Sequence, residues 1–192
     1  MAAVEDAVIV AGGIGSRMLP ASAAIAKELL PLVDIPAMTH LAREAINAGA
    51  KRLHIITSPT KDFSSILSDN SRAAQKRSDI DKELISPFND VEIKVHVQEV
   101  PKGFGDALNC ALHSIQGPFL VLLGDNILLD SYSGVSGYKA SNASKLLVEE
   151  FSKTSLPCVG LAAVEDPENY GVVSMNGNLV KDIIEKPSRS TA

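Results

Sequence analysis

The segment Ala7-Val8-Ile9-Val10-Ala11 runs directly into Gly12-Gly13-Ile14-Gly15-Ser16-Arg17. The apolar run predicts a buried strand. The three glycines predict a loop whose backbone can approach a ligand closely, with N–H groups that can converge on phosphate oxygens. Arg17 and, further along, Lys27 add two positive charges to this stretch. We therefore predict a strand followed by a polyphosphate-binding loop.

Two common glycine motifs do not fit this loop. A dinucleotide-binding fingerprint needs a third glycine where Met18 stands, and it should run into a helix that Pro20 disfavours. The G-x-x-x-x-G-K-[ST] pattern of a P-loop is absent. The glycines alone leave two interpretations open, a phosphate-binding loop or a tight turn with a solvated arginine.

Short apolar runs alternate with helical patterns along the chain. Strands are predicted at 8–11, 53–57, 91–97, 119–123 and 158–164, helices at 37–49, 103–115 and 136–153, and a hairpin at 172–175 and 179–184. The run at 180–184 also predicts a buried strand. A polar stretch at about 64–90 predicts a surface insertion. This alternation indicates an α/β fold with a doubly wound, mostly parallel sheet, which binds ligands at the carboxyl ends of its strands.

Composition narrows the class of protein. The chain has 192 residues, 45% hydrophobic and 21% charged, which is enough for one good-sized domain. A net charge of −5 is unfavourable for nucleic-acid binding. No apolar run reaches the ~20 residues that span a bilayer, and residues 1–6 lack a signal-peptide pattern. We expect a cytoplasmic protein with neither nucleic acid nor membrane as a partner.

Cysteine and histidine offer no recognisable metal motif. Cys110 and Cys158 are far apart in sequence, and we expect two buried, reduced thiols. No zinc-binding pattern such as H-E-x-x-H joins the histidines. We expect these to be scattered structural or surface residues: His40, His54, His96 and His113.

Longer motifs resolve the ambiguity of the glycine loop. G-x-G-S-R-x-L-P at 13–20 is followed by K-E-L-L-P at 27–31, Gln98 with P-K-G-F-G-D-A at 101–107, L-G-D-N at 123–126, Y-G-V-V at 170–173 and E-K-P at 185–187. In this order the motifs resemble the sugar-1-phosphate nucleotidylyltransferases, and within them the uridylyltransferases. The resemblance implies a Rossmann-like fold of the nucleotide-diphospho-sugar transferase type. It also implies Mg²⁺-dependent transfer of uridylyl from UTP to glucose-1-phosphate, giving UDP-glucose and pyrophosphate.

The resemblance also implies roles for individual residues. Arg17, Lys27 and Asp125 are the expected catalytic residues, and Asp125 is the expected Mg²⁺ ligand, since Mg²⁺ takes one or two carboxylates plus phosphate oxygens. A turn residue is the alternative for Asp125. Gln98 is expected to contact the base, because its amide can pair with an imide edge. The further nucleotide-binding residues are Ala11, Gly12, Gly13, Gly15, Ser16, Glu28 and Gly103, and the sugar-phosphate-binding residues are Gly171, Glu185 and Lys186.

The chain departs from the uridylyltransferase pattern at several positions. Ala23 and Ala26 replace a lysine and a proline, and Asp106 stands where histidine is frequent. Family members continue beyond the position of Ala192 and supply a second metal-binding aspartate there. We therefore expect residues 1–192 to be the N-terminal and central part of a catalytic domain, truncated at the C-terminus. We also expect a homo-oligomer. Two other functions stay open: a transferase for dTTP or another sugar phosphate, and a non-catalytic regulatory homologue.

Overall fold

The computed structural model describes residues 3–132 and 134–188. The chain divides into two compact units, Met1–Cys158 and Val159–Ala192, and each is described by itself. The expectation that residues 1–192 act as one catalytic domain stays a prediction. In the described part of the chain, no helix combines the length and the apolar character that crossing a membrane requires.

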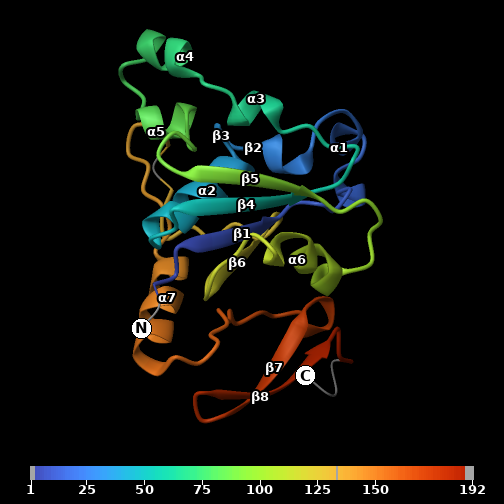
Figure 1. Cartoon of the computed structure of the whole chain (residues 1–192). Coiled ribbons are helices and arrows are strands. Elements are labelled where there is room, and N and C mark those ends of the chain that lie inside the picture. Colours follow the sequence, from blue (N-terminus) through green and yellow to red (C-terminus); the bar gives the residue numbers. More distant parts are fainter. Residues whose placement is uncertain (1–2, 133, 189–192) are drawn as a thin grey trace. The chain divides into compact units, whose positions relative to one another are not determined.

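A parallel four-stranded sheet is the centre of the first unit (Figure 1). Its strand order is β5-β4-β1-β6, so that β1 lies between β4 and β6 and pairs in parallel with both. The bounds are β1 Asp6–Val10, β4 Arg52–Thr57, β5 Glu92–Val97 and β6 Phe119–Leu123. The predicted doubly wound, parallel arrangement is confirmed for these strands.

Successive side chains of the strands point to opposite faces of the sheet. Both faces are apolar, and a helix covers each. Ala7 and Ile9 of β1 belong to the cluster that includes α2, Ala37–Asn47. Val8 of β1 packs instead with the side chains of α6, Phe104–Leu112. Because successive side chains of a strand point to opposite faces, one short strand anchors both layers. Both helices begin close to the positions that the sequence predicts and end sooner.

A third helix, α7, is packed next to α2. It spans Ala143–Thr154, so the predicted start at 136 is wrong. Asp130 accepts hydrogen bonds from the Ser141 hydroxyl (3.2 Å) and from the backbone N–H of Asn142 (3.1 Å). These side-chain bonds hold the preceding turn in a non-helical conformation and so delay the helix. Glu44 on α2 then accepts from the Ser144 hydroxyl at 2.6 Å, which ties the two helices together.

The polar stretch between β4 and β5 is a surface insertion, as predicted. It carries three short helices, α3 Ser64–Leu67, α4 Ser71–Lys76 and α5 Lys82–Ile85 (Figure 1). Phe63 and Phe88 flank them, and both side chains are buried in the main core. The insertion is therefore anchored at its two ends. The remaining short elements are α1 Ala21–Ala24, η1 Ser16–Met18, η2 Lys27–Leu29 and the two-stranded pair β2 Pro31–Leu32 with β3 Ile35–Pro36.

The second unit contains η3, Pro167–Asn169, and the predicted hairpin. β7, Gly171–Asn176, pairs antiparallel with β8, Leu179–Glu185, across a turn in which Gly177 has φ +59°. The buried strand predicted at 158–164 is wrong, because those residues form no strand and are exposed. β8 is exposed throughout, contrary to the prediction for 180–184. Among the described residues β8 pairs only with β7, and an apolar run is buried only where another layer covers it.

The two cysteines also differ from the expectation. Cys110 is half-buried and Cys158 is exposed, and both are free thiols. Cys158 is exposed because the segment that was predicted to be a buried strand is not one.

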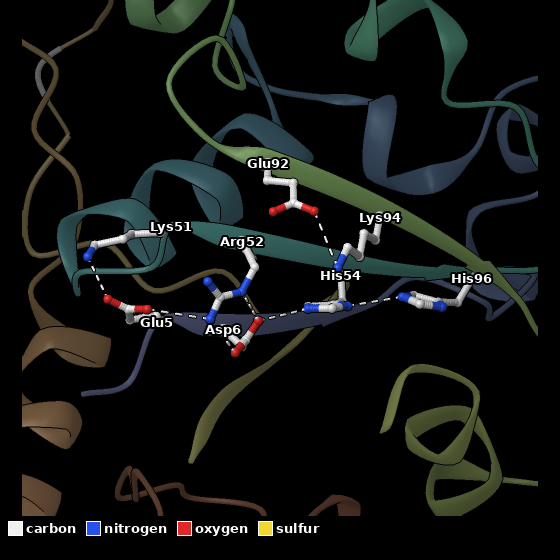
Figure 2. Close-up of polar contacts among 8 residues, drawn as sticks. All are labelled: Glu5, Asp6, Lys51, Arg52, His54, Glu92, Lys94 and His96. Atoms are coloured by element: carbon white, nitrogen blue, oxygen red, sulfur yellow. Dashed lines mark hydrogen bonds and ion pairs between the residues drawn. The ribbon is translucent and has the colours of Figure 1, made fainter. Parts of the chain in front are cut away.

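Three of the four histidines gather in one network instead of being scattered, and Figure 2 shows two of them, His54 and His96. His54 of β4 is fully buried; its Nε2 lies 3.0 Å from Asp6 Oδ1 and its Nδ1 lies 3.0 Å from His96 Nε2. The ring of His113 meets that of His96 edge-on. Arg52 donates to both oxygens of Asp6, at 2.7 and 2.9 Å.

This network couples folding to pH. Burial lowers the pKa of His96, and the neighbouring charges of His54, His113 and Lys94 act in the same direction. The Arg52 guanidinium lowers the pKa of Asp6 to about 2. A histidine whose pKa falls on folding destabilises the native state as the pH drops below its unfolded value, about 6.5. Asp6 stays ionised at that pH. It lowers the free energy of unfolding only in acid, as the pH falls from 3.8 to about 2.

We expect the free energy of unfolding to fall between about pH 7.5 and about pH 5.5, and to fall less in the variant His96→Gln. Glutamine can still donate toward His54 but takes up no proton in this range. Urea unfolding at several pH values measures the slope. A His96→Gln slope equal to that of the wild type would contradict this assignment.

Candidate active site

The candidate residues of the first unit lie at one edge of the parallel sheet. The glycine loop follows β1, Gln98 follows β5, and Asp125 follows β6. The carboxyl ends of parallel strands share an edge, where ligands of open α/β sheets bind. Lys61, which the sequence analysis missed, follows β4 at the same edge.

The glycine loop closes over the side chain of Lys27. Gly15 has φ +73°, and a Cβ built there would lie 2.8 Å from Lys27 Cδ. The Ser22 hydroxyl donates to the Gly15 carbonyl at 2.8 Å and fixes this turn. Arg17 and Ser16 are exposed in η1. Within the described part of the chain, the Arg17 side chain has no hydrogen bond or ion pair, so it can turn toward a ligand.

A buried carboxylate organises the cations of the site. Glu28 is 0% exposed and accepts from Lys61 Nζ at 3.0 and 2.8 Å. Lys27 Nζ lies 3.1 Å from Glu28 Oε1, and Lys61 also donates to the Ala11 carbonyl at 2.6 Å. Burial lowers the pKa of Lys61, and the hydrogen bond that Lys61 donates to Glu28 opposes that effect. Glu28 thus connects two lysines to the end of β1.

Asp125 faces the solvent beside this cluster. Its side chain is 68% exposed, and Oδ2 lies 3.5 Å from Lys27 Nζ, whose side chain is only 9% exposed. The preceding residue, Gly124, allows β6 to approach β1, because a Cβ there would lie 2.7 Å from the Val10 carbonyl oxygen. The local sequence around Gly124 does not reveal this role, because it carries no sign of a contact with another strand.

The site offers one carboxylate for a divalent cation. Both oxygens of Glu28 already accept from Lys61, whereas Asp125 is accessible and already faces a cation, the Lys27 ammonium. The described residues contain no group of three potential metal-ligating side chains. Mg²⁺ needs no such group, because it binds through one or two carboxylates, water and substrate phosphates. Asp125 therefore fits the expected ion as a single protein ligand.

Gln98 is held with its amide in a defined orientation. The side chain is largely buried, and Nε2 donates to Asp106 Oδ2 at 2.7 Å and to the Gly103 carbonyl at 3.3 Å. Oε1 faces the glycine loop, 3.6 Å from the position of a Cβ built on Gly12. The sequence analysis expects this amide to donate and accept toward a base, but its donor side is engaged. Only the acceptor is directed at the loop.

The three sugar-phosphate candidates lie together within the second unit. Gly171 is directly opposite Glu185 in the hairpin register, and a Cβ at Gly171 would lie 3.3 Å from Glu185 Oε2. The Lys186 N–H donates to the Tyr170 carbonyl at 2.9 Å. Glu185 is the last residue of β8 and Lys186 follows it, so both lie at the end of a strand of the antiparallel hairpin.

Comparisons with known proteins point to one family. The sequence profile of the nucleotidyl transferase family matches residues 6–192. The chain is 33% identical to a UTP–glucose-1-phosphate uridylyltransferase of Bacillus subtilis (strain 168), covering 100% of this chain and 68% of that protein. It is 30% identical to one of Streptococcus pyogenes, covering 100% and 66%. The chain thus spans about two thirds of the length of these relatives.

A solved structure extends the comparison to three dimensions. A UTP-bound UGPase from Acinetobacter baumannii matches with a TM-score of 0.77 and 25% identity, covering 98% of this chain and 70% of that one. The predicted nucleotide-diphospho-sugar transferase type of fold is therefore confirmed. From the profile match over nearly its whole length and the identity to curated relatives, the chain belongs to the nucleotidyl transferase family.

Proposed function

We propose that this chain supplies the nucleotide-binding and catalytic part of a UTP–glucose-1-phosphate uridylyltransferase. The observation that carries the proposal is the convergence of the glycine loop, Lys27, Gln98 and Asp125 at one sheet edge. Relatives at 30–33% identity carry that name, and a structural neighbour is described as UTP-bound. The site contains a base acceptor, a phosphate-binding loop, cations and a carboxylate, as the reaction requires.

The residues take distinct roles in this proposal. The loop from Ala11 to Ser16 binds the triphosphate through its backbone, with Gly12, Gly13 and Gly15 leaving room for it. Arg17 binds the phosphates that leave, and Lys27 the α-phosphate. Glu28 acts by holding Lys27 in place, since their charged atoms are 3.1 Å apart. Gln98 and Gly103 face the base.

The chemistry requires no protein nucleophile. A phosphate oxygen of glucose-1-phosphate attacks the α-phosphorus of UTP and forms a new P–O bond. The bond from that phosphorus to the oxygen bridging to the β-phosphate breaks, and pyrophosphate leaves with the electron pair. The protein accelerates this step by positioning the reactants and by placing preorganised positive charge where negative charge develops. Mg²⁺ held by Asp125 would supply further charge neutralisation on the phosphates.

The second unit contributes the sugar side of the proposal. Glu185 accepts hydrogen bonds from sugar hydroxyls, Lys186 binds the sugar phosphate, and the backbone of Gly171 contacts a hydroxyl. The register that pairs Gly171 with Glu185 supports a joint role. In this proposal residues 1–192 act together as one catalytic domain.

Pyrophosphate release across a panel of substrates tests the function. UTP, dTTP, CTP and ATP are each combined with glucose-1-phosphate, and UTP is then combined with other hexose-1-phosphates. We expect release with UTP and glucose-1-phosphate above all other pairs. A preference for dTTP over UTP would instead indicate a thymidylyltransferase. Tight UTP binding without turnover on any sugar phosphate would indicate a non-catalytic homologue.

Asp125→Asn tests the metal role. We expect the Mg²⁺ concentration for half-maximal activity to rise at least about tenfold, because even groups that only support metal ligands contribute 10- to 100-fold to affinity. Folding should be unaffected, since among the described residues this exposed carboxylate has only the 3.5 Å contact with Lys27. Asp90→Asn, an exposed carboxylate near the opposite end of β5, is the matched control. Equal Mg²⁺ dependence in the two variants would show that Asp125 is not a Mg²⁺ ligand.

The proposal also includes association with copies of the same chain and a cytoplasmic location. Light scattering of the purified protein tests the first, and cell fractionation tests the second. A mass equal to one chain at all concentrations would refute self-association.

A further inference from the structure

Asp106 and Gln98 form a contact that has no obvious structural purpose. Asp106 is a half-buried residue of the first turn of α6, and Gln98 directly follows β5. Their side chains meet at 2.7 Å between Nε2 and Oδ2. Backbone bonds hold both elements without this contact, since Gln98 N–H donates to the Thr57 carbonyl at 2.8 Å and Ala107 N–H to the Gly103 carbonyl at 3.1 Å. The contact instead determines which atom of the Gln98 amide faces the glycine loop.

The arrangement permits a single orientation of that amide. A carboxylate and a carbonyl accept hydrogen bonds and donate none, and Nε2 faces one of each, on Asp106 and Gly103. Rotating the amide by half a turn would bring Oε1 against both acceptors. In a side chain that is 8% exposed, water cannot relieve such contacts, so the rotated state is strongly disfavoured. Oε1 is thereby kept toward Gly12, whose missing side chain leaves it accessible.

We infer that Asp106 is a positioning residue that contributes to base selection. It does so by keeping the acceptor atom of the Gln98 amide, Oε1, directed toward the base. This inference rests on the proposed function, in which Gln98 faces the base. An acceptor matches the ring N3–H of uracil or thymine. It opposes cytosine, whose N3 is itself an acceptor. A freely rotating glutamine would match either ring, because its amide carries a donor and an acceptor. The selectivity for UTP over CTP therefore depends on Asp106 as well as on Gln98.

The variant Asp106→Asn tests the inference with little change of shape. Asparagine can accept from Gln98 Nε2 or donate to Oε1, so only the more distant Gly103 carbonyl, at 3.3 Å, then opposes the rotated amide. Titration calorimetry on the whole chain, without sugar phosphate, measures the dissociation constants of UTP, CTP and 3-methyl-UTP, which lacks the N3–H. We expect the wild type to bind UTP at least about tenfold more tightly than either of the others, because an unmatched buried acceptor is costly.

In Asp106→Asn we expect the ratio of CTP to UTP dissociation constants to fall at least about fivefold, mainly through tighter CTP binding. Removing a negative charge near a triphosphate changes both affinities by the same factor, so the ratio isolates the effect on the base. In a Gln98→Ala background the same substitution should change the ratio by less than about twofold, since the two residues act as one unit. Asn109→Ala, an exposed position on the same helix, should leave the ratio unchanged.

Asp106→Ala provides a second variant if the asparagine variant does not fold, as judged by circular dichroism. It removes the 2.7 Å bond and leaves Gln98 with only the weaker 3.3 Å contact to Gly103. The ratio should again fall. A UTP-selective protein in which both substitutions leave the ratio unchanged would overturn the role of Asp106 and leave the proposed function standing. A wild-type chain that does not bind UTP would instead refute the proposed function, and this inference with it.

Discussion

Replacing Arg17 by alanine is expected to lower the rate of uridylyl transfer at least ~10²-fold. Removing one preorganised group that stabilises developing charge has an effect of this size. The structure is consistent with such a role because Arg17 follows the glycine loop, is exposed, and makes no ion pair within the described residues. Its charge is therefore available to the departing pyrophosphate. Steady-state kinetics of pyrophosphate release at saturating UTP and glucose-1-phosphate measures the loss.

The loss should be confined to steps that involve the triphosphate. Binding of glucose-1-phosphate alone should change much less, and the free energy of unfolding should stay within about 0.5 kcal/mol of the wild type, as for most exposed positions. Arg72→Ala, an exposed arginine on α4 in the surface insertion, is the matched control and should retain full activity. If Arg17→Ala is as active as that control, Arg17 is a solvated turn residue.

Replacing Lys61 by methionine should lower the free energy of unfolding by about 3 kcal/mol, because removing one partner of a buried ion pair leaves the other charge uncompensated. Methionine keeps most of the length and the apolar character of the lysine stem and removes the ammonium group with its charge and hydrogen bonds. The fully buried Glu28 would lose two contacts of 3.0 and 2.8 Å, and among the described residues it would keep only Lys27, at 3.1 Å. The Ala11 carbonyl would lose its 2.6 Å bond. Urea unfolding at neutral pH measures the change.

Two further variants separate the buried charge from other causes. Lys51→Met makes the same substitution in an ion pair with Glu5 whose lysine is 69% exposed, and it should change the free energy of unfolding much less, because water screens an exposed pair. The double variant Lys61→Met with Glu28→Leu removes both charges and should be more stable than Lys61→Met alone, because no buried carboxylate then lacks a partner. Equal stability of the two single lysine variants would show that Glu28 does not depend on Lys61.

Local pattern predicts much of the core of this fold. The apolar run at β1, the glycine loop and the helix starts of α2 and α6 depend on a few neighbouring residues, and all were predicted. The shared edge of the glycine loop, Gln98 and Asp125 follows from the parallel strand order, which the strand–helix alternation already indicates. The same patterns failed for residues 158–164, because an apolar run does not specify whether another strand pairs with it.

The strand–loop unit of the site and the order of its motifs follow from local sequence, because backbone periodicity and glycine geometry act over a few residues. The contacts between distant side chains depend on the assembled fold. Lys61 meets Glu28, Asp106 orients Gln98, and Gly124 lets β6 approach β1. Lys61 and Glu28, and likewise Gly124 and β1, are far apart along the chain, so no local pattern records either contact. Each depends on distances of a few ångströms that exist only once the sheet has assembled.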